Sequence, residues 1–247
     1  MSAYIRAQSA GEIFRNAAHL YRENFRALFL VYVLPLAPLA ASFGYYVSGS
    51  GSCALLAVAY ALLVVGSVLA IVPITVVLSD VCLGNRPDLG RAFRLLSQRS
   101  AGRLVGTCLL SVALCGLGAM LLLVPGLILI VHYAFVVPVA VLERISGWQA
   151  LRRSRELGKG FFWRVCGIVF LSYAVVFVVS WLIGGVLVVV RMMVRLSLSL
   201  PVVGMIANLL ALPLAPLPAI VLVLLYYDLR VRKEAYDSAA LAEDLRR

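Results

Sequence analysis

Six long apolar runs restrict this chain to a helical membrane fold. They lie at about residues 27–47, 54–79, 104–124, 126–142, 165–190 and 202–227, and none has an Asp, Glu, Lys or Arg in its interior. A helix needs about 20 apolar residues to cross the hydrocarbon core of a bilayer, and most of these runs reach that length. Composition agrees, because 63% of the 247 residues are hydrophobic and only 13% are charged. We therefore predict one all-α integral membrane domain with six transmembrane helices.

No charged residue divides the third run from the fourth, so the boundary between them is inferred. Residues 104–142 contain no Asp, Glu, Lys or Arg, and this stretch is too long for a single span. Pro and Gly are typical of turns, so the sequence "VPG" at 124–126 predicts the turn of a tight helical hairpin.

The basic residues predict the orientation of the domain. Of the 22 Lys and Arg residues, all but Arg191 and Arg195 lie before the first run, in 80–103, in 143–164 or after the last run. These four segments alternate with nearly charge-free loops, so the positive-inside rule predicts cytoplasmic N- and C-termini. The net charge of +11 then favours anionic lipid headgroups as a partner over nucleic acid.

Three of the basic segments have the pattern of amphipathic helices. They precede the first, third and fifth runs, and in the first of them Ile13, Ala17 and Tyr21 fall on one face opposite charged residues. Basic helices with aromatic residues lie in the headgroup plane. The sequence therefore predicts an interfacial helix followed by a transmembrane hairpin, three times over.

The sequence predicts no cofactor and no metal site. Neither a catalytic motif nor a phosphate-binding loop occurs, and the two histidines, His19 and His132, are isolated. The five cysteines lie mostly within or beside apolar runs without a CxxC motif, which is typical of small core residues. They are Cys53, Cys82, Cys108, Cys115 and Cys166.

Nine residues are candidates for function or for docking a partner. His132 is the one imidazole within a span, where a structural histidine paired to a neighbouring helix is the favoured interpretation. Glu143 and Glu156 could form an acid–base pair, but salt-bridged surface charges are favoured because Arg residues surround both. The candidates are His132, Glu143, Arg152, Arg153, Glu156, Asp228, Arg230, Arg232 and Glu234.

The last run ends in "LVLLYYDLRVRKEAYD", residues 222–237. Tyr226 and Tyr227 are predicted at the headgroup boundary, where aromatic side chains are enriched. Beyond them, Asp228–Arg232, Arg230–Glu234 and Lys233–Asp237 are spaced as i,i+4 ion pairs. We therefore predict that the helix leaves the bilayer intact and that residues 228–247 form a cytoplasmic helical tail.

Three stretches resemble a known membrane domain. They are "VPGLILIVHYAFVVPVAVL" (124–142), "ERISGWQALRRSRELGKGFFWRV" (143–165) and "LLYYDLRVRKEAYD" at the tail. Together they look like the membrane domain associated with bacterial glycerophosphoryl diester phosphodiesterases and its stand-alone relatives. In fused members the activity belongs to a separate soluble barrel with His, Glu and Asp around a metal, and no matching motif occurs here. The resemblance thus implies a non-enzymatic six-helix module in a bacterial inner membrane.

Three functions are compatible with these observations. The favoured one is a membrane module that supports or recruits a protein partner in a lipid- or envelope-related process. The alternative is a transporter or lipid-handling protein with a cavity between Pro-kinked helices, since many transporters are built from repeats. The third is a membrane-embedded enzyme that acts on lipid headgroups through His132, Glu143 or Glu156.

Overall fold

The computed structural model describes residues 6–34, 53–85, 87–97, 101–121, 123–195 and 200–234. Every regular element within these ranges is helical, which confirms the all-α prediction. In chain order these are α1 (Ala10–Glu23), an unlabelled helix Phe25–Leu34, α3 (Cys53–Cys82), α4 (Leu89–Ser97), α5 (Ala101–Leu121), α6 (Leu123–Tyr133), α7 (Val136–Leu142), α8 (Trp148–Gly158), α9 (Phe162–Val194), α10 (Leu200–Ala211), the 3₁₀ turn η2 (Leu212–Leu214) and α11 (Leu217–Glu234).

Two stretches of the described chain are long and apolar enough to cross a membrane. They are Phe162–Val194, which is α9, and Val202–Glu234, which contains α10, η2 and α11. Four shorter apolar helices accompany them, at Phe25–Leu34, Gly66–Cys82, Gly102–Gly118 and Gly126–Leu142. The rest of the first predicted run, residues 35–47, lies outside the described residues.

Two of the predicted uninterrupted spans are broken, which corrects the sequence-based boundaries. The run at 126–142 is divided between α6 and α7, with turn residues at Ala134 and Phe135. Ser154 of α8 stabilises this break, because its hydroxyl accepts from the Phe135 N–H at 3.2 Å and donates to the His132 carbonyl at 2.8 Å. The run at 202–227 is interrupted by η2, where prolines cannot continue the α-helical hydrogen bonds.

The predicted turn at Val124–Gly126 is wrong, because α6 begins at Leu123 and these residues are already helical. Proline is tolerated in the first turn of a helix, where its missing N–H would have no partner. The predicted pairing of the third and fourth runs is confirmed, since α5 and α6 pack together. A Cβ added at Gly118 of α5 would lie 2.6 Å from Leu129 Cδ1 and 3.2 Å from Gly126 Cα, so this contact requires glycine.

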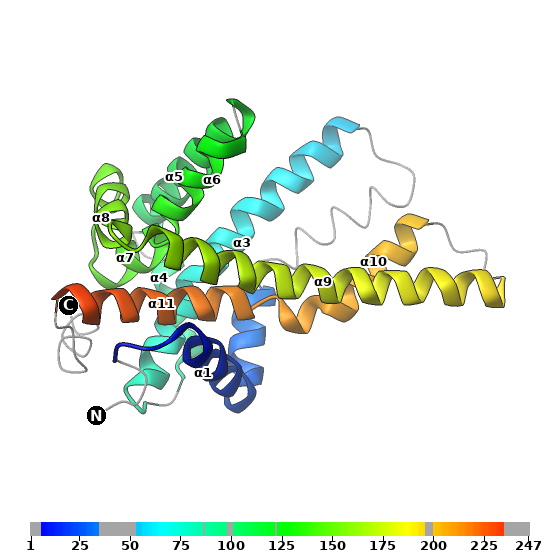
Figure 1. Cartoon of the computed structure of the whole chain (residues 1–247), viewed down its shortest axis with the longest axis horizontal. Coiled ribbons are helices and arrows are strands. Elements are labelled where there is room, and N and C mark those ends of the chain that lie inside the picture. The colour runs from blue at the N-terminus through cyan, green and yellow to red at the C-terminus, as the bar shows by residue number, and fades with distance from the viewer. Residues whose placement is uncertain are drawn as a thin grey trace.

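Helix α11 is the centre of the fold. It contacts α1, α3, α8 and α9, and every residue from Pro218 to Leu229 is buried. Figure 1 shows α11 crossing the middle of the molecule with α1 beside it. The apolar face of α1 is therefore covered by a protein helix, with Ile13, Ala17 and Tyr21 buried.

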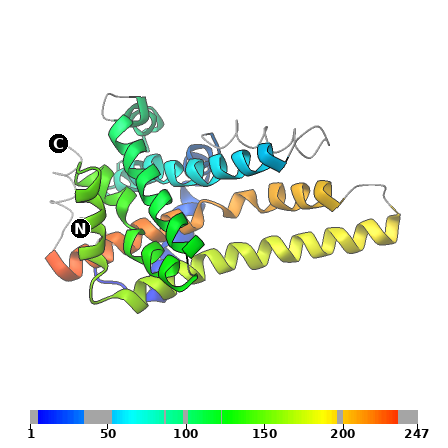
Figure 2. The same ribbon diagram turned by 90° about the horizontal axis from the view of Figure 1, so that it is seen from above.

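Helix α9 begins beside α11 and then runs away from the other helices. Figures 1 and 2 both show its last turns reaching farther than any other labelled helix, with α10 alongside as the return arm of a hairpin. Large apolar side chains along α9 are exposed, including Phe177, Trp181 and Val186.

Candidate functional site

Asp228 of α11 is the hub of a buried ion-pair network. Its side chain is 0% exposed and accepts four hydrogen bonds from three residues. The Gln8 backbone N–H donates at 2.7 Å and the Arg232 Nε at 3.0 Å, both to Oδ1. Arg164 at the start of α9 donates to Oδ2 from Nε at 3.2 Å and Nη2 at 3.0 Å. A buried carboxylate is tolerated when it is paired and fully hydrogen-bonded in this way.

The same two arginines also hold the backbone of Gln8. Arg164 Nη2 donates to the Gln8 carbonyl at 2.5 Å and Arg232 Nη2 at 2.9 Å. The Gln8 side chain accepts from Asn16 Nδ2 at 2.8 Å. We call Gln8, Arg164, Asp228 and Arg232 the Asp228 cluster. It fastens the segment before α1 to the start of α9 and to the end of α11.

Helix α1 follows directly from this clamp and begins with a capping box. The Ser9 hydroxyl accepts from the Glu12 N–H at 3.2 Å, and the Glu12 carboxylate accepts from the Ser9 N–H at 2.7 Å. The hydrogen bond from the Ser9 N–H to the carboxylate is the main cause that lowers the pKa of Glu12. The clamp and the cap together orient α1 across α11.

A second network joins α7, α8 and α11, and we call it the Glu143 cluster. Glu143, directly after α7, accepts from Arg153 Nε at 2.8 Å and from the Tyr226 hydroxyl at 3.0 Å. Arg153 of α8 also pairs with Glu234, and Arg230 Nε donates to Glu234 at 3.0 Å. Burial alone would lower the pKa of Arg153, but its hydrogen bonds to Glu143 and Glu234 raise the pKa above its ordinary value.

Helix α8 is positioned for this network at both ends. At its start, Gly147 has a φ of 63°, a region that favours glycine, and its N–H donates to Thr107 Oγ1 at 2.7 Å. At its end, the Lys233 ammonium donates to the carbonyl oxygens of Glu156 at 2.6 Å and Lys159 at 2.7 Å. A cation at the last carbonyls of a helix satisfies acceptors that have no partner within the helix.

The structure divides eight of the nine candidate residues into three groups and leaves His132 by itself. Glu143, Arg153, Arg230 and Glu234 meet in the Glu143 cluster, and Asp228 and Arg232 meet in the Asp228 cluster. Arg152 and Glu156 form an exposed i,i+4 pair at 3.0 Å on α8. His132 lies apart from both clusters.

His132 makes local contacts. Its Nδ1 lies 2.7 Å from the carbonyl oxygen of Ile128, one turn earlier in α6. Its ring centroid is 5.6 Å from that of Phe162. The hydrogen bond is therefore within α6 rather than to a neighbouring helix as predicted, and the contact with α9 is through the Phe162 ring.

The predicted position of the tail tyrosines is wrong. Tyr226, Tyr227 and Asp228 are each 0% exposed, so they lie in the protein core rather than at a lipid boundary. The Tyr227 hydroxyl lies 2.5 Å from Ser79 Oγ of α3. Of the predicted i,i+4 pairs, Asp228–Arg232 and Arg230–Glu234 are both present at 3.0 Å. Asp237 and the rest of the tail, 235–247, lie outside the described residues.

Sequence reasoning missed Gln8 and the role of Arg164. Gln8 is a neutral residue that acts through its backbone, so no side-chain pattern marks it. Arg164 is visible as the charge before the fifth apolar run, but its partner Asp228 is 64 positions away. Glu143 was expected to be a surface charge, and its side chain is instead only 15% exposed.

Asp80 is a further buried acid that sequence reasoning placed outside the second run. It lies in the last turn of α3 with its side chain 2% exposed, and its Oδ1 is 3.3 Å from Arg91 Nη1 of α4. Its Oδ2 is buried without a hydrogen-bond partner. The pair connects α3 to α4, as the Glu143 cluster connects α8 to α11.

Within the described residues, no three His, Cys, Asp or Glu side chains are grouped so that they could hold a metal ion. The carboxylates of Glu143, Asp228 and Glu234 each accept from Arg side chains. Such ion pairs fix helices relative to one another. We call the Asp228 and Glu143 clusters together the charged head.

Comparison with known proteins gives one match. Residues 100–247 match a family described as a domain of unknown function, DUF8558. The chain belongs to the DUF8558 family. No curated protein and no solved structure matches it significantly.

The DUF8558 match contains most of the charged head. It runs from α5 to α11 and includes every member of the Glu143 cluster, together with Arg164, Asp228 and Arg232. Gln8 and α1 lie outside it. The family description names no activity, so the resemblance to the phosphodiesterase-associated membrane domain stays a prediction.

Proposed function

We propose that this chain is a non-catalytic, multi-pass module of a bacterial inner membrane, and that its charged head docks a protein partner at the cytoplasmic surface. The six apolar segments then cross or enter the bilayer, and both termini are cytoplasmic. The process served is lipid- or envelope-related, as the resemblance to the phosphodiesterase-associated domain implies.

The observation that carries this proposal is the segregation of exposed charge. Helices α1, α4 and α8, the start of α5 and the α7–α8 loop present basic side chains beside the charged head, whereas Arg191 and Arg195 alone mark the far end of α9. The exposed basic residues near the head are Arg15, Arg22, Arg26, Arg94, Arg103, Arg144, Arg152, Arg155 and Lys159. Exposed acidic residues such as Glu23, Asp88 and Glu156 are fewer, so this surface is net basic and attracts acidic partners and anionic headgroups.

Two of the three exposed tryptophans support the same orientation, and the third, Trp181, lies farther along α9. Trp148 at the start of α8 is 67% exposed and Trp163 at the start of α9 is 82% exposed. Both lie at the level where the basic segments meet apolar helices, and Trp is enriched at membrane–water interfaces. In the proposed orientation, Trp148 and Trp163 therefore lie in the headgroup region.

The rigidity of the head supports docking over catalysis. Its carboxylates are held by arginines in fixed geometry, with Glu143 on Arg153 and Asp228 on Arg164. A surface held by ion pairs presents its exposed charges in one arrangement, which reduces the entropy lost when a partner binds.

Photo-crosslinking in native membranes tests the proposal. A photoreactive amino acid at Arg155, on the exposed face of α8, is compared with the same group at Met193, 79% exposed near the tip of α9. We expect one protein partner to be captured from position 155 only, and Arg152→Glu with Lys159→Glu to abolish that capture. Equal capture from both positions, or capture unchanged by the charge reversal, contradicts the proposal.

The orientation has its own test. Single cysteines at Lys159 and Met193 are introduced into a chain with its native cysteines replaced by Ala. We expect a membrane-impermeant maleimide to label position 159 only from the cytoplasmic side and position 193 only from the opposite side. Labelling of both positions from one side contradicts the six-span topology.

A further inference from the structure

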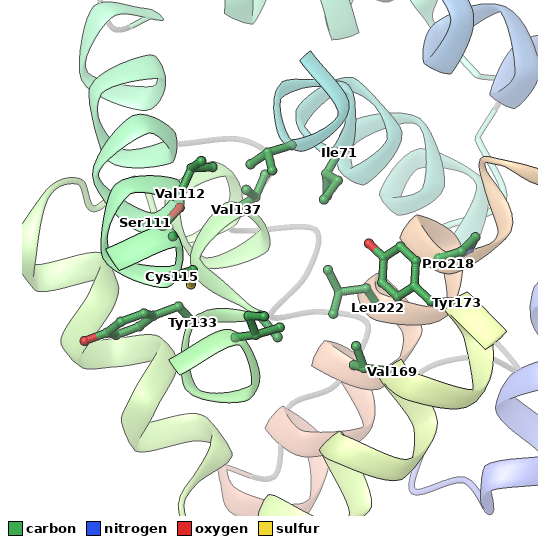
Figure 3. Close-up of a pocket in the computed structure, with 14 residues that line it drawn as sticks. Ile71, Ser111, Val112, Cys115, Tyr133, Val137, Val169, Tyr173, Pro218 and Leu222 are labelled. Carbon is green, nitrogen blue, oxygen red and sulfur yellow. The ribbon is translucent and has the colours of Figure 1, made fainter. Parts of the chain in front are cut away.

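An apolar pocket lies among the helices above the charged head. It has a volume of about 580 Å³ and is lined by residues of α3, α5, α6, α7, α9 and α11. Figure 3 shows Ile71, Val112, Val137, Val169 and Leu222 turned toward a common space from five of these helices. Pockets that hold small-molecule ligands typically measure about 300–1,000 Å³.

The lining restricts what can occupy this space. None of the lining residues is charged, and its polar atoms are confined to the hydroxyls of Ser111, Tyr133 and Tyr173 and the thiol of Cys115. The Ser111 hydroxyl already donates to the Cys108 carbonyl at 2.8 Å. A buried water needs two to four polar partners, so this pocket suits an apolar occupant better than water or a polar solute.

The pocket is closed toward the charged head. Leu222 in its wall lies one helical turn before Tyr226, and Val137 lies two residues after Phe135. The rings of Phe135 and Tyr226 are both 0% exposed, with centroids 6.5 Å apart, and they separate the pocket from the ion pairs. An occupant therefore does not enter from the head.

The pocket lining reaches the outer surface of the described helices at α6 and α9. Two of its lining residues are also on the outer surface of the described helices, Ile130 of α6 at 44% exposure and Tyr173 of α9 at 57%. The most apolar part of α9 has none of its residues buried, so the surface beside these residues is apolar as well. Such a surface faces hydrocarbon when the helices stand in a bilayer.

We propose that the pocket binds one acyl chain of a membrane lipid, which enters laterally between α6 and α9 while the headgroup stays at the bilayer surface. A helix of a partner is about 10–12 Å wide with its side chains and requires a longer groove. A flexible hydrocarbon chain matches the shape and the polarity of the pocket and the apolar surface beside it. This binding site goes beyond the docking function proposed above and does not depend on it.

A photoreactive lipid tests the site directly. The purified full chain is reconstituted in vesicles that contain phosphatidylethanolamine with a diazirine at the middle of one acyl chain, and the labelled residues are identified by mass spectrometry. We expect labelling to concentrate on residues such as Val112, Ile130 and Val169 and to be competed by unlabelled lipid. Labelling spread evenly over the outer face of α9, without competition, overturns the proposal.

Two glycine variants make the test specific. A Cβ added at Gly116, which lines the pocket, or at Gly185, on the outer part of α9, would meet no heavy atom within 4 Å. Gly116→Phe is expected to reduce labelling of Val112 and Ile130 by roughly tenfold, which corresponds to about 1.4 kcal/mol of binding free energy. The matched control Gly185→Phe is expected to leave the labelling of Val112 and Ile130 unchanged. Equal effects of both variants, or no effect of either, overturn the site.

A second pocket variant covers a failure of Gly116→Phe to fold. Ala134→Leu enlarges a half-buried lining residue by less, and its folding is checked by thermal unfolding before labelling. It must reduce labelling while its melting temperature stays near that of the native chain. Capture at position 155 is measured on the same variants. Loss of lipid labelling with intact partner capture supports a separate acyl site, whereas intact labelling in the folded Ala134→Leu protein counts against it.

Discussion

Helix α9 and the α10–α11 segment are similar as sequences and opposite as structures. Each is a stretch of 33 residues that is long and apolar enough to span a membrane. None of the most apolar 18-residue window of α9 is buried, whereas 61% of the corresponding window of Val202–Glu234 is buried. The first helix presents its apolar side chains outward, and the second supplies the core of the fold.

The difference shows that apolarity and burial are separate properties in this chain. Apolar side chains leave water with a similar gain whether a bilayer or a protein interior receives them. What distinguishes α11 is its polar end, where Tyr226, Tyr227 and Asp228 bond to α3, the α7–α8 loop, α9 and the segment before α1. These directional bonds place α11, and not α9, at the centre of the fold.

The largest difference between the two segments is expected when the Asp228 carboxylate, the hub of α11, is removed. Asp228→Ala leaves the guanidinium groups of Arg164 and Arg232 without their carboxylate, and truncating one side of a buried pair costs about 3–5 kcal/mol. We expect a corresponding loss of stability in chemical unfolding of the protein in detergent. The control is Glu156→Ala, which breaks an exposed pair and should change stability by less than about 0.5 kcal/mol. Equal losses would mean that the hub does not hold α11.

Core packing gives the next largest expected effect. Leu224 on α11 is 0% exposed and Leu182 on α9 is 64% exposed. Leu224→Ala should destabilise the protein by about 2–5 kcal/mol because it leaves a cavity. Leu182→Ala should have an effect within about 0.5 kcal/mol, because lipid or detergent fills the space. Thermal unfolding of the two variants in one detergent measures the difference, and similar shifts would contradict the inside–outside assignment.

A smaller effect is expected for one buried hydroxyl. Tyr227→Phe removes the hydrogen bond to Ser79 of α3, and such a bond contributes about 1 kcal/mol. Ser180→Ala on α9 is the counterpart, since its hydroxyl donates to the Val176 carbonyl of its own helix. We expect the tyrosine variant to lower the unfolding midpoint more than the serine variant. The reverse order would show that the α3–α11 contact is dispensable.

The smallest expected effect depends on pH and concerns Glu234, seven residues beyond Tyr227. Burial would raise the pKa of Glu234, but hydrogen bonds from Arg230 and Arg153 lower it below the ordinary value. A carboxyl group with a lowered pKa in the folded state stabilises the fold above its unfolded pKa, and this contribution disappears as the pH falls through the folded value. The native chain should therefore exceed Glu234→Gln in stability at pH 7, and the two should converge in acid. A constant difference across pH titrations of unfolding would exclude this contribution.

Much of the fold follows from pattern alone. The apolar runs and the amphipathic segments predict helices at nearly the right places, because hydrophobic periodicity is a local property. The errors fall at Val124–Gly126, which is helical instead of a turn, and at Phe135 and η2, where a predicted continuous helix is broken. At Phe135 the freed backbone N–H is accepted by Ser154, a residue of a different helix, and no local pattern contains that partner.

Most members of the candidate site were predictable, but Gln8, Arg164 and the organisation of the site were not. The spacing of Asp228, Arg230, Arg232 and Glu234 predicts the i,i+4 pairs of α11. The pairs between Glu143 and Arg153, and between Arg153 and Glu234, require three elements to meet. The sequence shows charges at the ends of apolar runs and does not say which ends come together.

By itself the sequence determined that this chain is helical, strongly apolar and basic at one set of loops, because these properties depend on composition and local spacing. The tertiary structure alone decided that α11 is buried while α9 is exposed, and that Tyr226 and Tyr227 lie in a core instead of a lipid boundary. The physical reason is that hydrophobic transfer does not distinguish a bilayer from a protein interior, whereas hydrogen bonds and ion pairs between distant residues do.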